Sequence, residues 1–115
     1  MSMAVVSPFD QVVAALGKGD VEALSHYFDK MVEISLDGKS SSYSKSQASV
    51  ILKDFFSDHQ AGSFKIIHQG KSGKGASFGI GNLKTNSGTF RVTFFFRPKG
   101  DEVVLQELRF QESKN

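Results

Sequence analysis

Alternation of apolar and polar residues over residues 88–99 predicts the central strand of the fold. One face would carry the apolar set Phe90, Val92, Phe94 and Phe96. The other face is mixed, with Arg91, Thr93, Phe95 and Arg97. Because the first face is so apolar, we expect this strand to lie inside a sheet and beneath a cover of other elements.

Helical spacing of apolar residues predicts helices in the first half of the chain. A Ser-Pro start and a Gly-x-Gly stop bound a helix over residues 7–19. Asp20 is positioned to cap a second, shorter helix that reaches Phe28. A Ser-x-x-Gln capping box at residues 44–47 begins a third helix, which ends near His59.

The remaining segments predict strands. Residues 31–37 alternate and form the first strand, and a brief return strand follows at residues 42–43. From residue 63 onward the period stays at two, with strands expected at 63–70, 75–85, 89–97 and 102–111. Short Gly- and Asn-bearing loops between them predict an antiparallel meander. Helices first and strands afterwards predict a single α+β domain over residues 1–115.

This order of elements resembles the cone-shaped fold of nuclear transport factor 2 and ketosteroid isomerase. More closely, the chain resembles a small uncharacterised bacterial family within that superfamily, which is also called cystatin-like. The likeness covers nearly the whole chain and is carried by SKSQASVILKDFF, SFKIIHQGKS, GTFRVTFFF and LQELRF. It implies N-terminal helices packed on a curved, mainly antiparallel sheet. It implies no single activity, because the superfamily includes isomerases, dehydratases, ligand binders and protein-binding scaffolds.

The same alternation assigns side chains to the inner face of the sheet. Besides the apolar face of the central strand, we expect inward positions at Phe64, Ile66, Phe78, Ile80, Val104, Leu108 and Phe110. This phasing also turns His68, Asn82 and Gln106 inward, with Tyr43 or Tyr27 approaching from the cover. A few polar groups in an apolar concavity describe a pocket for a small apolar ligand. They equally describe a closed core whose polar groups are hydrogen-bonded, and the sequence leaves both interpretations open.

The outer face is too apolar for a sheet surface that meets only water. Its predicted members are Ile67, Leu83, Arg91, Thr93, Phe95, Arg97, Leu105, Glu107 and Arg109. Arginine and aromatic residues are enriched at association surfaces, so we expect a homodimer through this face. The resemblance implies the same, since members of the superfamily commonly pair there. The alternatives are a monomer whose Arg stems cover the apolar residues, and a scaffold that binds a different chain.

Composition narrows the classes of partner. The chain has 11 Phe, no Trp, no Cys and a net charge of +2, which is too small to indicate nucleic acid binding. Without cysteine, disulfides and thiolate metal sites are excluded. We expect neither a membrane-spanning helix nor a signal peptide in the sequence as given. The chain is expected to be soluble, and cytoplasmic unless a signal peptide has been removed to leave a periplasmic or secreted protein.

Candidate catalytic and cofactor motifs are weak. The glycines of residues 70–75 and 79–81 lack the spacing of phosphate and dinucleotide loops, and the histidines lack metal-ligand spacing, so no cofactor or metal is expected. The isomerases of this fold use an inward carboxylate, whereas the inward strand positions here hold no Asp or Glu. The leading hypothesis is a non-enzymatic homodimer with a small apolar cavity. The alternatives are an isomerase-like or dehydratase-like enzyme with His68 as its base, and a protein-binding scaffold.

Overall fold

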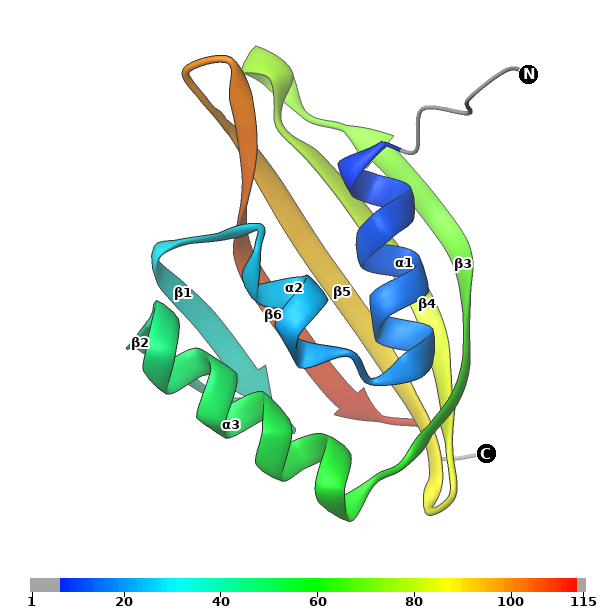
Figure 1. Cartoon of the computed structure of the whole chain (residues 1–115). Helices are drawn as coiled ribbons and strands as arrows, with labels where there is room; N and C mark the ends of the chain where they lie inside the picture. Colours follow the sequence, from blue (N-terminus) through cyan, green and yellow to red (C-terminus); the bar gives the residue numbers. More distant parts are fainter. Residues whose placement is uncertain (1–6, 114–115) are drawn as a thin grey trace, which may run out of the picture.

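Three helices lie on one face of a curved six-stranded sheet in the part of the chain that the computed structural model describes, residues 7–113 (Figure 1). The elements are α1 (Pro8–Lys18), α2 (Val21–Ser25), β1 (Phe28–Leu36), β2 (Lys39–Ser44), α3 (Lys45–Asp58), β3 (Ala61–Lys71), the single turn η1 (Gly73–Gly75), β4 (Ser77–Thr85), β5 (Gly88–Lys99) and β6 (Glu102–Glu112). The predicted α+β class is therefore confirmed.

The strand order across the sheet is β2-β1-β6-β5-β4-β3. All neighbouring strands are antiparallel except β1 and β6, which run parallel. The last strand thus lies beside the first, and β3 to β6 form the predicted meander. Helix α1 packs on β3 and β4, whereas α3 packs on β1 and β2, so the two helices cover opposite halves of the sheet.

The predicted helix ends are confirmed by their capping contacts. Ser7 Oγ accepts a hydrogen bond from the Asp10 amide at 3.1 Å, and Gly19 ends α1 with a φ of 67°. The capping box of α3 is complete, with both reciprocal contacts between Ser44 and Gln47. One helix boundary was wrong, because α2 ends at Ser25 and Phe28 is the first residue of β1. The first strand therefore starts before the predicted residue 31, and β2 is longer than the predicted 42–43.

Phenylalanine rings form the two main contact groups of the core, and β5 contributes to both. Phe94 lies 5.1 Å from Phe9 and 5.9 Å from Phe96, measured between ring centroids. Toward the other end of β5, Phe90 lies 5.1 Å from Phe55, which in turn lies 4.6 Å from Phe110. The inward face of β5 is almost fully buried, as its alternation predicted.

The predicted phase of β4 was wrong. Phe78, Ile80 and Asn82 face outward, and Gly79, Gly81 and Leu83 face the core. The reason is steric: a Cβ on Gly79 would lie 2.6 Å from the Phe94 ring, and one on Gly81 would lie 2.5 Å from the Phe64 ring. The aromatic rings of neighbouring strands already fill the inward side of β4, so only glycine fits there.

Bulges correct the predicted phase of two further strands. The pairing of β3 with β4 shifts between Ile66 and His68, which leaves His68 exposed on the outer face. The pairing of β6 with β5 shifts at Gln106, so Leu105 instead of Val104 is fully buried and Gln106 is exposed. A bulge adds one residue to one strand and thereby reverses the faces beyond it.

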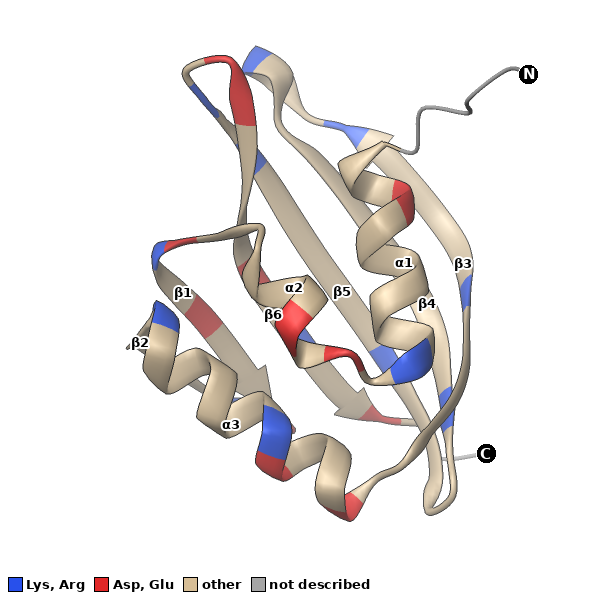
Figure 2. Ribbon diagram, viewed as in Figure 1, with Lys and Arg blue, Asp and Glu red and all other residues tan. Residues whose placement is uncertain are grey.

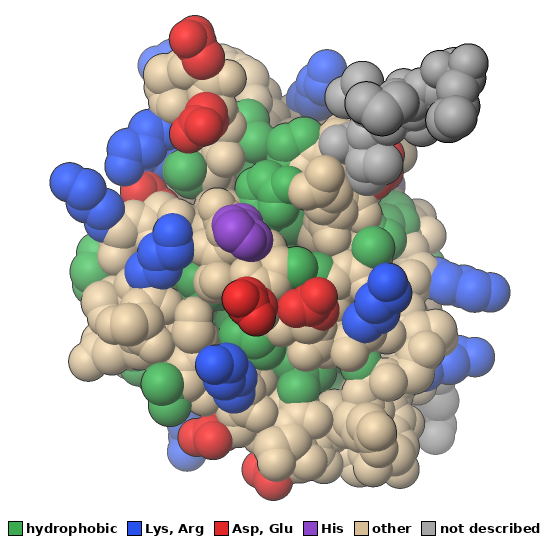
Figure 3. Space-filling view, viewed as in Figure 1, with side chains coloured by type: hydrophobic (Ala, Val, Ile, Leu, Met, Phe, Trp, Pro, Cys, Tyr) green, Lys and Arg blue, Asp and Glu red, His purple; other side chains and the backbone are tan. Residues whose placement is uncertain are grey.

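Basic and acidic positions are distributed over helices, strands and loops (Figure 2). On the helical side, charged side chains of both signs are interspersed, with apolar side chains visible between them (Figure 3).

An ion triad crosses the outer face of the sheet at the start of β6. Asp29 of β1 is nearly buried and accepts hydrogen bonds from Arg97 at 2.8 Å and from Lys99 at 2.9 Å, both from β5. Because β6 lies between β1 and β5, these contacts connect two strands that are not neighbours. The hydrogen bonds from Lys99 and Arg97 hold the pKa of the Asp29 carboxyl well below its usual range.

Replacing Gly81 by alanine should destabilise the fold by about 1–3 kcal/mol, because the added methyl group meets both the Phe64 ring and a backbone oxygen. Urea unfolding would measure the difference. Gly73→Ala is the control, since a Cβ there has nothing within 4 Å. Equal stability of the two variants would contradict the inward position of Gly81.

Asp29→Asn should lower the free energy of unfolding at neutral pH by about 1–3 kcal/mol, through loss of two charge-assisted hydrogen bonds. Because the folded pKa lies below the unfolded value, the carboxylate stabilises the fold above a pH of about 4. This contribution is lost as the pH falls through the folded pKa. Urea unfolding should therefore show a smaller difference between wild type and variant at about pH 3 than at about pH 7.

The exposed loop residue Asp101 provides the control for this experiment. Asp101→Asn should change stability by less than about 0.5 kcal/mol at either pH. A pH-independent difference for Asp29→Asn would show that charge is not what Asp29 contributes.

Candidate functional site

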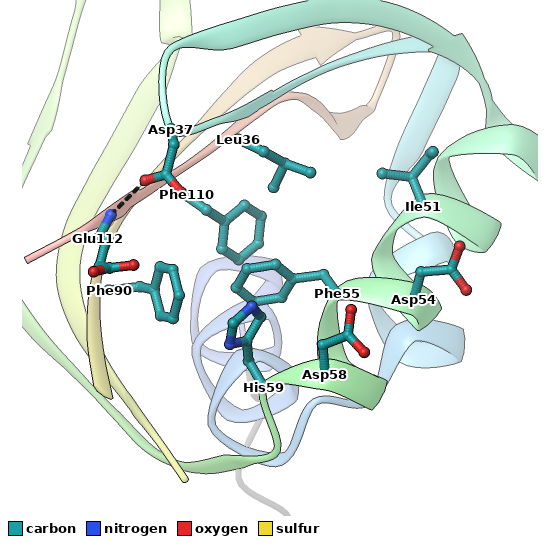
Figure 4. A pocket seen from close by; sticks show the side chains of 10 residues that line it. All are labelled: Leu36, Asp37, Ile51, Asp54, Phe55, Asp58, His59, Phe90, Phe110 and Glu112. Atoms are coloured by element: carbon teal, nitrogen blue, oxygen red, sulfur yellow. Dashed lines mark hydrogen bonds between the residues drawn. The ribbon is translucent and has the colours of Figure 1, made fainter. Parts of the chain in front are cut away.

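A hollow of about 310 Å³ lies between α3 and the ends of three strands (Figure 4). Helix α3 and its C-cap supply one wall, and the end of β1 with its turn, β5 and β6 supply the other. The lining residues are Leu36, Asp37, Ile51, Asp54, Phe55, Asp58, His59, Phe90, Phe110 and Glu112.

The floor of the hollow is aromatic and closed. Phe55, Phe90 and Phe110 expose 8%, 3% and 1% of their surfaces, so the rings seal the core below the hollow. The His59 ring packs against Phe55 and Phe90, with centroids 4.8 Å from each. His59 Nδ1 also lies 2.5 Å from the hydroxyl of Ser87, which connects the end of α3 to the β4–β5 turn.

The rim of the hollow is acidic. Its carboxylates are Asp54 and Asp58 from α3, Asp37 from the turn after β1, and Glu112 at the end of β6. Asp37 has a φ of 50°, and its Oδ1 accepts a hydrogen bond from the Glu112 amide at 2.8 Å, so this carboxylate is held in place. Among the described residues that line the hollow, none is Lys or Arg.

An aromatic and charged stripe crosses four strands on the outer face of the sheet. The His68 ring lies 5.6 Å from Phe78, which lies 6.2 Å from Phe95. The Arg109 guanidinium lies over the Phe95 ring at 5.5 Å, and its Nε lies 2.5 Å from a carboxylate oxygen of Glu107. We call these five residues the outer stripe; it joins β3, β4, β5 and β6.

The predicted pocket residues do not converge. His68, Asn82 and Gln106 all face away from the helices, because of the bulges in β3 and β6 and the phase of β4. Asn82 accepts a hydrogen bond from Arg91 at 3.0 Å on that outer face. Tyr43 is half-buried and packs against the core. The predicted inward pocket was therefore wrong for His68, Asn82 and Gln106.

The predicted outer-face residues are placed more accurately. Arg91, Thr93, Phe95, Arg97, Glu107 and Arg109 all lie on the outer face. Ile67 lies in the β3 bulge and is 51% exposed. Leu83 and Leu105 were assigned wrongly, because both are fully buried in the core. Nothing in these positions by itself shows a partner.

Sequence reasoning missed the hollow because its residues come from distant segments. One signal was present: Asp54 and Asp58 stand one turn apart at the C-terminal end of a helix, where acidic residues are unfavourable. The assembly of α3 with the ends of β1, β5 and β6 depends on packing that no local pattern encodes.

Two further classes of site are absent from residues 7–113. No group of three or more His, Cys, Asp or Glu side chains in this range is arranged to hold a metal ion. No helix in the same range is long and apolar enough to cross a bilayer.

Comparison with known proteins identifies the chain's relatives. A crystallised DUF4783 family protein from Bacteroides uniformis is 33% identical, with a TM-score of 0.87 over 92% of this chain and 97% of that one. Another, from Bacteroides fragilis, is 29% identical, with a TM-score of 0.86 over 97% of this chain and 100% of that one. No curated protein matches the chain.

More distant structures share the fold alone. An NTF-2 like protein of unknown function from Silicibacter pomeroyi has a TM-score of 0.64 at 12% identity, covering 92% of this chain and 90% of that one. This agrees with the resemblance to nuclear transport factor 2 seen in the sequence. The model of the domain of unknown function DUF4783 matches residues 9–111. The chain therefore belongs to the DUF4783 family, and its fold is similar to that of nuclear transport factor 2-like proteins.

Proposed function

We propose that this protein is a small-molecule-binding domain and that the hollow beside α3 is its binding site. The observation that carries the proposal is the aromatic floor formed by Phe55, Phe90 and Phe110 beneath a polar rim. Ligand sites in proteins are typically concave, lined by apolar and aromatic groups, and oriented by a few polar ones. The volume of about 310 Å³ suits a small molecule with one ring or a short chain.

The isomerase-like alternative receives no comparable support. It required His68 inside the fold, and His68 is exposed on the outer face beside Phe78. The proposal therefore concerns binding, in a hollow different from the cavity that the sequence predicted.

Filling the hollow should abolish binding of a small aromatic probe. Ile51 lines the hollow, so Ile51→Trp would occupy it, whereas Val50 on the same helix is 58% exposed and lies outside it. Amide NMR spectra titrated with phenethyl alcohol should shift at the hollow in wild type and Val50→Trp, and not in Ile51→Trp. Shifts that cluster elsewhere on the molecule would contradict this site.

The outer stripe supports a second proposal, self-association through the outer face of the sheet. Phe78, Phe95 and Ile80 form a half-buried apolar centre, and the ends of the face differ in charge. Lys65 and Arg91 lie toward β3, whereas Glu33 lies on β1. In a two-fold pair of sheets, the basic end of one copy would meet the acidic end of the other.

The size of the face agrees with such a pair. The molecule measures 37 × 35 × 25 Å, and a stable interface buries about 800 Å² on each partner. A sheet face of this extent can supply that area without the helices.

Phe95→Glu should convert a dimer to a monomer, because it places a carboxylate at the centre of the proposed contact. Sedimentation velocity would measure the change, with circular dichroism to verify folding. The matched control is Val50→Glu, which adds the same charge at an exposed position of α3. A wild-type protein that sediments as a monomer would overturn the proposal and leave the outer face to a different partner chain.

A further inference from the structure

We infer that the hollow selects an organic cation, specifically a protonated amine attached to an apolar body. The inference rests on the proposed function, since it names the class of ligand that the same hollow would take. It follows from the charge of the rim, from where two of its carboxylates stand on α3, and from the aromatic floor.

The rim concentrates negative charge around an apolar space. Four carboxylates from three segments surround it, namely Asp54 and Asp58 of α3, Asp37 after β1, and Glu112 at the end of β6. In Figure 2 the acidic positions at the end of α3 and at the end of β6 lie at the same end of the molecule. Since no described lining residue is Lys or Arg, the field in the hollow favours a cation and disfavours an anion.

Two of these carboxylates destabilise the helix that carries them. Asp54 and Asp58 stand four positions apart on α3, so their like charges are neighbours across one helical turn. Both lie at the C-terminal end, where the helix dipole is already negative, and the last turn holds no basic residue. Neither side chain has a hydrogen-bond or ion-pair partner among residues 7–113.

No hydrogen bond or ion pair among residues 7–113 offsets the unfavourable placement of these two carboxylates. A cation in the hollow would offset both the repulsion between the carboxylates and their conflict with the helix dipole. Both side chains are exposed to solvent at the rim, so a cation in the hollow can reach them.

The floor and the spacing of the carboxylates favour an organic cation over a metal ion. The described acidic groups do not come together closely enough to ligate a metal. The parts of Phe55 and Phe90 that line the hollow form an apolar floor for the body of such a ligand. Asp37 is oriented through one carboxylate oxygen, so its other oxygen can accept a hydrogen bond from the amine.

Three probes with the same phenyl body separate charge from shape. They are phenethylamine, phenethyl alcohol and hydrocinnamate, which are cationic, neutral and anionic at neutral pH. NMR titration should give a dissociation constant about tenfold lower for the amine than for the alcohol, because several near-surface charge pairs act together. Hydrocinnamate should bind more weakly than the alcohol, and the preference for the amine should decrease with added salt.

The outcomes distinguish the inference from the proposed function. Equal binding of amine and alcohol in the hollow would overturn the charge preference and leave the binding site intact. Binding of none of the three would overturn both.

A second experiment tests the two helix carboxylates through stability and affinity together. Asp54→Asn and Asp58→Asn each remove one negative charge with little change in helix propensity. Each should raise the melting temperature of the ligand-free protein by about 2–5 °C. Each should also weaken phenethylamine binding by roughly threefold to fivefold and leave phenethyl alcohol binding unchanged.

Asp10→Asn is the matched control, since Asp10 lies in the first turn of α1, where a carboxylate favours the dipole. It should lower the melting temperature and leave amine binding unchanged. If the double variant Asp54→Asn, Asp58→Asn binds phenethylamine as tightly as wild type, the inference is wrong.

Discussion

Close packing of phenylalanine rings against the glycines of β4 is the contact on which the rest of this fold depends. Phe94 and Phe64 lie where the Cβ atoms of larger residues on β4 would be, so β4 can approach only with Gly79 and Gly81 facing inward. That choice turns Phe78, Ile80 and Asn82 to the outer face. One steric constraint in the core therefore decides the chemistry of the opposite surface, where Phe78 joins the outer stripe.

The other end of β5 has a different role. There Phe90 meets Phe55 and Phe110, and these rings close the core from one side while forming the floor of the hollow on the other. The stability of the core and the proposed binding site thus depend on the same side chains. The rim differs from the floor, because its residues Asp54 and Asp58 do not stabilise the fold. They oppose the helix dipole and repel each other. Packing of the buried core must therefore offset these unfavourable charge interactions on α3.

The two surfaces lie on opposite sides of the sheet and need not interfere. The hollow opens where α3 meets the strand ends, and the outer stripe crosses β3 to β6 on the face without helices. Self-association through the stripe would leave the hollow open in both copies. On the same outer face, the Asp29 triad connects β1 to β5 across β6.

Local patterns in the sequence determined which segments are helices and strands, because capping boxes, glycine stops and alternating residues act through neighbouring positions. The caps at Ser7 and Ser44 and the apolar face of β5 were predicted correctly for this reason. Tertiary structure alone decided the phase of β4 and the bulges at Ile67 and Gln106, which reversed the faces of His68, Asn82 and Leu105. In β4 the period of two favoured the face with Phe78 and Ile80 as the inner one, but the rings of Phe64 and Phe94 leave room only for the glycines of the other face. The hollow, too, exists only in the tertiary structure, because α3, β1, β5 and β6 are distant in sequence and meet only after the sheet has formed.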